Sequence, residues 1–231
     1  MSAIWGMISK NNNPTDSIAH KMQESMKIFK IDQYCHILRD SAYFACGMQY
    51  FTEASHADTL PLYDEKNGIY FTADCVLTNR SELIQLLSEA YAPETLSAYG
   101  DGVLSYKAYL RFGENFVSYL RGSFSFAIYN TEKDEVLLYA DHFARRYLAY
   151  YAENGTVFFS TAYQPLLAVL DKEQRKINEH WIAAAYTDCT ADTVKLHGDT
   201  VYENICHVEP GQYVKIHLTT GKKDAVSYWN P

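Results

Sequence analysis

Hydrophobic residues recur along this chain at two periods, one typical of helices and the other of strands. Ile18, Met22 and Met26 stand four residues apart and predict a helix over about 14–29, since that spacing places them on one helix face. Three more helices are expected over 101–112, 164–170 and 178–186.

A further helix carries its own start and stop signals. Asn79 is a favourable N-cap and Glu82 stands three residues later, as in a capping box, while Pro93 stops the helix. Its buried face is expected to consist of Leu83, Leu86, Leu87 and Ala90.

Runs rich in aromatic, β-branched and small residues predict the strands. The runs are 2–8, 43–48, 68–73, 123–129, 135–140, 148–152, 156–160, 213–218 and 225–229. Short polar turns separate the four runs between 123 and 160, which predicts an antiparallel meander, and the last two runs predict a hairpin turning at 219–221. Two groups of strands with helices between them predict an α+β fold, with two antiparallel sheets packed face to face and helices outside.

The composition fits one folded domain over residues 1–231. Hydrophobic residues make up 48% and charged residues 21% of the chain, enough for a substantial core. The net charge is −8 and no basic cluster is longer than Lys222-Lys223, so we expect no nucleic-acid partner.

The cysteines and the apolar runs indicate the redox state and the cellular location of the protein. No Cys-x-x-Cys or Cys/His spacing could assemble a metal site, so we expect no metal and reduced thiols. The start lacks the features of a signal peptide and no apolar run is long enough to span a bilayer, which predicts a cytoplasmic protein without membrane contact. The five cysteines are Cys35, Cys46, Cys75, Cys189 and Cys206.

The sequence around residue 125 is recognisable. Residues 121–130 read Arg-Gly-Ser-Phe-Ser-Phe-Ala-Ile-Tyr-Asn and resemble the Asn-Gly-Met-Phe-Ala-Phe-Ala-Ile-Tyr-Asp segment of asparagine-synthetase-like proteins. Asp141-His142-Phe143, with the residues up to Tyr151, resembles the next family stretch, Asp-Arg-Phe-Gly followed by Lys-Pro-Leu-Tyr-Tyr. Matches over 159–168, 202–213 and 228–229 follow in family order, so the resemblance spans the whole chain.

This resemblance implies a class II glutamine amidotransferase domain, a four-layer αββα sandwich of the N-terminal-nucleophile type. In that family the residue after the initiator Met is a Cys whose thiol attacks the amide of glutamine, with its own α-amino group as the base. The ammonia passes to a synthetase domain that activates a carboxylate with ATP.

The first site residue departs from the family. The expected Met-Cys-Gly-Ile-x-Gly reads Met1-Ser2-Ala3-Ile4-Trp5-Gly6, which puts the hydroxyl of Ser2 where the nucleophilic thiol is expected. An N-terminal Ser can act as a nucleophile with its α-amine as base, but a site built around a thiolate normally loses much of its rate with Ser.

The residues expected to bind the substrate also depart from the family pattern. The family's Asn-Gly-Glu loop, which supplies oxyanion donors and a substrate carboxylate, aligns with Asp74-Cys75-Val76. Asp74 is an acceptor where an amide donor is expected, Cys75 keeps only its backbone N–H, and Val76 cannot bind an ammonium group. Residues 47–50 hold no Arg to clamp the carboxylate of glutamine. Asp101 matches the family's Asp at a helix start, although an N-cap role also explains it and is favoured over the family role.

The basic residues and the sequence motifs do not predict an anion site or a nucleotide site. His142, Arg145 and Arg146 follow one another in a turn and are expected to be solvated rather than to form an anion site. The phosphate loop of asparagine synthetases, Ser-Gly-Gly-x-Asp-Ser, is absent from the sequence, so no cofactor is expected in this domain, and ATP and Mg²⁺ belong to a partner.

Three functions follow from these observations. The first is a pseudoenzyme domain that has lost glutamine hydrolysis and acts as scaffold and interface for an amide-forming synthetase, in cis or in trans. β-Lactam synthetases and lasso-peptide cyclases use such domains, and the loop 73–80 resembles that of the cyclases. The second is an active serine amidohydrolase that uses Ser2 to release ammonia, and the third is an unrelated binding module. A homodimer is an alternative assembly.

Overall fold

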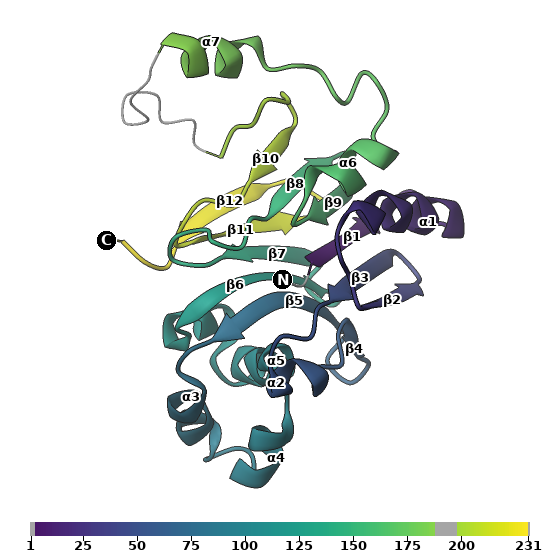
Figure 1. Cartoon of the computed structure of the whole chain (residues 1–231). Helices are drawn as coiled ribbons and strands as arrows, with labels where there is room; N and C mark the ends of the chain where they lie inside the picture. The colour runs from purple at the N-terminus through teal and green to yellow at the C-terminus, as the bar shows by residue number, and fades with distance from the viewer. Residues whose placement is uncertain (1–2, 188–197, 231) are drawn as a thin grey trace.

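The structure, a computed structural model, describes residues 3–187 and 198–230 of the chain and contains two antiparallel sheets stacked face to face (Figure 1). Among these residues, the first sheet has the strand order β10-β8-β9-β1-β3-β2 and the second the order β12-β11-β7-β6-β5-β4. The first sheet consists of β1 (Ala3–Ser9), β2 (Gln33–Arg39), β3 (Ala42–Met48), β8 (Ala149–Glu153), β9 (Thr156–Ser160) and β10 (Ile205–His207). The second consists of β4 (Leu62–Asp64), β5 (Ile69–Leu77), β6 (Gly122–Asn130), β7 (Glu135–Ala140), β11 (Gln212–His217) and β12 (Lys223–Ser227).

Helices cover the outer faces of both sheets, which gives four layers. The first sheet is covered by α1 (Asp16–Ser25), the 3-10 turn η1 (Met26–Ile28) and α6 (Tyr163–Val169). The second is covered by α3 (Arg80–Leu87), α4 (Pro93–Ala98), α5 (Asp101–Phe112) and the 3-10 turn η2 (Gly113–Tyr119). The remaining helices are the short α2 (Glu53–His56) and α7 (Glu179–Thr187).

The strand β1 shows how the layers depend on sequence. Its side chains alternate, so that Ile4 and Ile8 enter the core between the sheets, whereas Trp5 and Met7 pack beneath α1 and α6. All seven residues of the strand are buried. Because both faces of β1 are buried, the strand requires a continuous apolar run rather than an alternating one.

Most of the predicted elements are confirmed. The predicted bounds of α5, β7 and β9 are those of the structure, and β11 pairs with β12 across the predicted turn. The helix over 14–29 is α1 continued by η1, and the side chain of Thr15 provides its N-cap. The sequence did not indicate β2, β4, β10 or α2.

The predicted four-stranded meander is wrong. β6 pairs with β7 in the second sheet, and β8 pairs with β9 in the first. The chain therefore crosses from one sheet to the other between Ala140 and Ala149. Short polar turns look alike in sequence whether they join neighbouring strands or lead into another layer.

The helix that follows Asn79 also differs from its prediction. Asn79 precedes α3, but its side chain makes no cap bond to that helix. Its Oδ1 accepts from the backbone N of Arg121 at 2.9 Å, and its Nδ2 donates to the backbone O of Tyr119 at 3.0 Å. Leu86 is 45% exposed, unlike the buried Leu83 and Leu87. α3 ends at Leu87, before the exposed Ala90, so Pro93 opens α4 instead of stopping α3.

Gly6 is required by close packing at the centre of the first sheet. A Cβ added there would lie 2.3 Å from the backbone O of Tyr43 and 2.5 Å from the ring of Phe159. We expect Gly6→Ala to lower the free energy of unfolding by about 2–3 kcal/mol, because neither neighbour can withdraw within the core. Urea titration followed by circular dichroism measures this loss.

Gly221→Ala is the control for this measurement. Gly221 lies in the turn between β11 and β12 with φ 68° and has open space around it, so only backbone strain of about 1 kcal/mol is expected. Equal losses in the two variants would contradict the packing argument.

Candidate functional site

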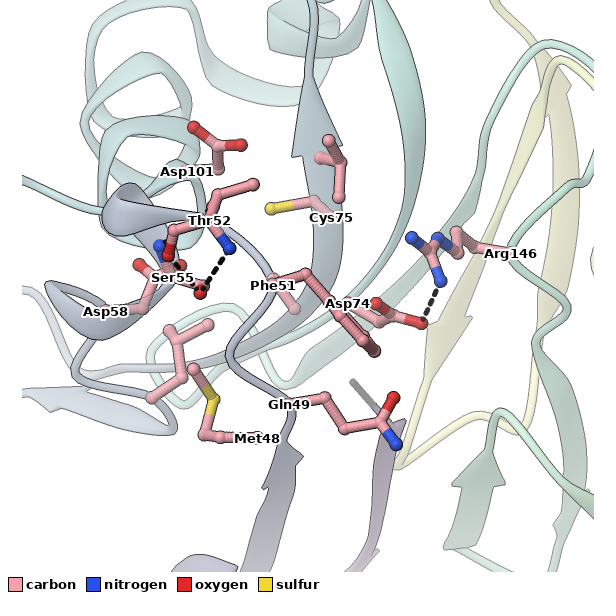
Figure 2. A pocket seen from close by; sticks show the side chains of 13 residues that line it. Met48, Gln49, Phe51, Thr52, Ser55, Asp58, Asp74, Cys75, Asp101 and Arg146 are labelled. Atoms are coloured by element: carbon pink, nitrogen blue, oxygen red, sulfur yellow. Dashed lines mark hydrogen bonds and ion pairs between the residues drawn. The ribbon is translucent and has the colours of Figure 1, made fainter. Parts of the chain in front are cut away.

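A pocket opens at one end of the sandwich, where β3 and β5 end and α5 begins (Figure 2). Its volume is about 40 Å³, room for about three water molecules. The polar or charged side chains that line it are Gln49, Thr52, Ser55, Asp58, Asp74, Asp101 and Arg146, and Cys75 adds a thiol. The structure thus places three of the predicted site residues, Asp74, Cys75 and Asp101, around one pocket.

The start of β1 lies close to this end of the sandwich. Ala3 pairs with Gly47 at the end of β3, immediately before Met48, which lines the pocket. Ser2 itself lies outside the described residues. The expectation that Ser2 occupies the nucleophile position therefore stays a prediction.

Asp74 and Cys75 are neighbours on β5 and point to opposite sides of it. Asp74 points toward Arg146, and Cys75 points toward the helix side of the pocket, where Asp101 lies (Figure 2). This alternation follows from the strand geometry. It places an acid and a thiol in the same pocket without bringing them together.

The carboxyl of Asp74 is buried and has one cationic partner among the described residues. Its Oδ2 lies 3.4 Å from Nη1 of Arg146, and the two side chains are 4% and 13% exposed. Burial raises the pKa of Asp74 to about 7, although the positive charge of Arg146 acts in the opposite direction. Asp74 is therefore a mixture of acid and carboxylate near neutral pH.

The turn after β7 places Arg146 in the pocket. The fully buried carboxylate of Asp141 accepts from the backbone N–H groups of Phe143, Arg145 and Arg146, at 2.9 to 3.1 Å, and from that of Phe124 on β6 at 3.2 Å. These four bonds hold the backbone so that the Arg146 side chain reaches β5.

The prediction for the three basic residues of this turn is thereby corrected. Arg145 is exposed, as expected, with its guanidinium 5.8 Å from the ring centre of Phe143. His142 is half-buried among aromatic rings, and burial lowers its pKa. Arg146 belongs to the pocket.

Asp101 does not cap its helix. It is the first residue of α5, and its Oδ2 accepts from the backbone N of Leu77 at 2.9 Å, while its Oδ1 pairs with Nη1 of Arg80 at 2.6 Å. These bonds join the end of β5 to the starts of α3 and α5. The N-cap explanation of Asp101 is therefore wrong. Both carboxylate oxygens of Asp101 accept hydrogen bonds from other elements of the domain.

The cap of α5 comes from Asp58, a residue that the sequence did not indicate. Its carboxylate accepts from the backbone N of Gly102 at 3.1 Å and that of Val103 at 3.0 Å. A carboxylate at a helix N-terminus satisfies free N–H groups and the helix dipole. Burial nevertheless raises the pKa of Asp58 to about 6.

Cys75 and Val76 offer no catalytic group in their present setting. Burial raises the pKa of the Cys75 thiol well above its usual value, which keeps the sulfur protonated and weakly nucleophilic. Val76 is 42% exposed and apolar. In the region where the family resemblance implies an arginine clamp, Met48 and Gln49 line the pocket.

Membrane-spanning helices and disulfide bonds are absent from the described residues. No helix among them is long and apolar enough to cross a membrane. Cys35, Cys46, Cys75 and Cys206 are free thiols, and Cys189 lies outside the described residues.

Comparison with known proteins now gives the family. The chain matches the glutamine amidotransferase domain family over residues 1–229 and belongs to it. It is 20% identical over 178 residues to the amidase chry2 of Gibberella zeae, a match that covers 77% of this chain and 25% of the amidase.

Solved structures give the same fold. The glutamine phosphoribosylpyrophosphate amidotransferase from B. subtilis aligns with a TM-score of 0.65 at 12% identity, over 99% of this chain and 50% of that one. A structure described as the allosteric regulatory enzyme of purine biosynthesis aligns with a TM-score of 0.64 at 13% identity, over 99% and 49%. The predicted α+β sandwich of the class II, N-terminal-nucleophile type is confirmed. The chain spans about half the length of these enzymes and a quarter of the amidase.

The buried Asp74 carboxyl makes stability depend on pH in a definite direction. Its folded-state pKa of about 7 lies above the usual value of about 3.9, so the folded protein holds this proton more tightly than the unfolded chain. The stabilisation is complete below pH 4 and is lost as the pH rises to 7. Relative to Asp74→Asn, the wild-type free energy of unfolding should fall by up to about 1.4 kcal/mol per pH unit across that window.

Denaturant titrations at several pH values, on both proteins, test this expectation. Asp224→Asn is a matched control at an exposed carboxylate, which pairs with Lys222. If the pH slopes of the wild type and Asp74→Asn differ no more than those of the wild type and Asp224→Asn, Asp74 is not the buried acid described above.

Proposed function

We propose that this domain no longer hydrolyses glutamine and acts as scaffold and interface for an ATP-dependent synthetase domain that forms an amide bond. The observation that carries the proposal is the Asp74–Arg146 pair in the pocket. At this position the family resemblance implies an amide donor for the oxyanion. A carboxylate there is an acceptor, and its charge offsets that of Arg146, so the pair offers a developing oxyanion little stabilisation.

The small size of the pocket supports the same proposal. A volume of about 40 Å³ holds a few water molecules, whereas ligand sites usually enclose roughly 300–1,000 Å³. The groups that could bind the two ends of glutamine are engaged elsewhere, Asp101 with Arg80 and Leu77, and Arg146 with Asp74.

The partner proposed is a synthetase domain, in cis or in trans, that binds ATP and Mg²⁺ itself. The resemblance of loop 73–80 to that of lasso-peptide cyclases, and the family's use of such domains beside amide-forming synthetases, support this choice. In such a pairing the nitrogen nucleophile is already on the substrate, so no ammonia is needed from this domain.

One observation favours the alternative, a serine amidohydrolase that uses Ser2. With a pKa of about 7, Asp74 is partly protonated, and a protonated carboxyl can donate a hydrogen bond to an oxyanion. However, the α-amino group must be deprotonated to act as base, and its usual pKa is about 8. The two requirements oppose each other, so only a small fraction of molecules would meet both at any pH.

We expect glutamine hydrolysis by the purified protein to stay at the background rate between pH 6 and pH 9, because the donor, the clamp and the thiol are replaced together. Ammonia release is measured with the wild type and with Ser2→Ala under the same conditions. A rate well above that of Ser2→Ala, with a narrow maximum between the pKa values of Asp74 and the α-amine, would support the serine hydrolase instead.

Ser2→Cys alone is expected to leave hydrolysis at background. A thiol restores the nucleophile but neither the oxyanion donor nor the carboxylate clamp, and loss of one such donor costs on the order of a hundredfold in rate. Iodoacetamide labelling, with Ser2→Ala as reference, reports whether the new thiol is accessible. Labelling without turnover agrees with the proposal, whereas labelling with steady glutamine turnover would contradict it.

A further inference from the structure

A second pocket lies away from the first, where η2 leads into β6 and the chain leaves β12. It is formed by three segments distant in sequence, which contribute Arg121, then His142 and Phe143, and then Tyr228 and Trp229. Its volume is about 380 Å³, within the usual range for small-molecule sites. None of the residues that line it also lines the first pocket, which contains Asp74 and is called the Asp74 pocket below.

The walls of this pocket are fixed by hydrogen bonds behind them. The backbone N–H groups of Tyr228 and Trp229 donate to the backbone O of Gly211 at 3.0 and 3.2 Å, and the Tyr228 hydroxyl donates to the backbone O of Ala140 at 2.6 Å. His142 lies in the turn organised by Asp141. A ligand would therefore meet a surface that is already ordered, which lowers the entropy lost on binding.

The aromatic side chains leave an open corner. The rings of Phe143 and Trp229 lie 5.3 Å apart at 66°, and His142 meets Trp229 edge-on at 5.3 Å and 82°. Phe143 is nevertheless 64% exposed. A planar ring placed in this corner could contact one aromatic face and one aromatic edge, an arrangement that aromatic groups prefer.

The charge of the pocket is positive, in a chain whose net charge is −8. Nη1 of Arg121 donates to the backbone O of Ser118 at 3.0 Å and of Leu120 at 2.9 Å, which fixes the guanidinium. Within residues 3–187 and 198–230, its Nη2 and Nε have no hydrogen-bond partner and no carboxylate pairs with it. Arg145 places a second cation beside Phe143.

No acidic side chain of residues 3–187 and 198–230 pairs with Arg121. No Asp or Glu is among the described residues that line the pocket. The nearest carboxylate along the chain, Asp141, is buried and accepts four backbone N–H groups, so it is turned away from a ligand. A fixed guanidinium with free donors is the group that best recognises a carboxylate or phosphate.

We propose that this pocket binds a small organic anion, a planar ring that carries a carboxylate or a phosphate. The anionic group bonds to the free donors of Arg121, and the ring occupies the corner between Phe143 and Trp229. The proposed anion site does not depend on glutamine chemistry. The proposal therefore applies whether or not the Asp74 pocket is active.

Binding is measured on the full chain with benzoate and phenyl phosphate, by calorimetry and by tryptophan fluorescence, with Trp229→Phe identifying the contribution of Trp229 beside those of Trp5 and Trp181. We expect saturable binding of one or both below about 10 mM, and a change in indole emission, since Trp229 forms a wall of the pocket. Benzamide and benzyl alcohol lack the charge and acetate lacks the ring, and each should bind at least about tenfold more weakly.

Two variants divide the contributions of charge and ring. Arg121→Gln should weaken the anions about tenfold or more without changing the affinity for benzyl alcohol, because only the charge-assisted bonds are lost. Phe143→Ser should weaken all ring compounds about tenfold. Because Phe143 is exposed, the variant should keep the wild-type fold, which circular dichroism checks.

The matched controls are Arg111→Gln and Phe29→Ser. Arg111 is an exposed arginine that pairs with Glu89 on the helix layer, and Phe29 is an exposed phenylalanine after η1. Neither lines the pocket. Anions that bind no better than their neutral analogues, or that lose as much affinity in the controls as in Arg121→Gln and Phe143→Ser, would overturn the proposal.

Discussion

The carboxylate of Asp141 is the contact on which the arrangement of both pockets depends. It is fully buried at the point where the chain passes from the second sheet to the first, and it accepts four backbone N–H groups. A buried charge is tolerated only when such bonds replace its hydration. By forming them, Asp141 fixes the turn that sends Arg146 toward Asp74 on one side and presents His142 and Phe143 on the other.

The Asp74 pocket illustrates how a binding site can be filled by its own side chains. Asp74 pairs with Arg146, Asp101 joins β5 to two helices, and Asp58 caps α5. Each charged group thus has an internal partner, and each partner stabilises the end of the sandwich. Asp58, Asp74 and Asp101 therefore contribute to the framework at this end of the domain.

The sequence predicted the elements whose pattern is local. α5 was placed at its true bounds because apolar spacing and Gly113 mark both its course and its end. β2 was missed because it is an edge strand, in which polar and apolar residues mix without alternation. The site was predicted through alignment of β5, but Arg146 was not, because it meets Asp74 across 72 residues and only the crossing between the sheets brings them together. Asp58 was missed for the same reason, since a cap supplied from another segment leaves no trace beside the helix.

The position of β1 has a consequence for the order in which the protein folds during synthesis. β1 precedes the other strands of its sheet along the chain, yet it lies inside that sheet between β3 and β9, so one of its edges has no neighbour until residues 156–160 have left the ribosome. Until then an apolar strand that is buried on both faces in the finished domain is only half paired, and such edges promote aggregation. The first sheet can therefore be completed around β1 only after β9 has left the ribosome, because β9 pairs with the second edge of β1.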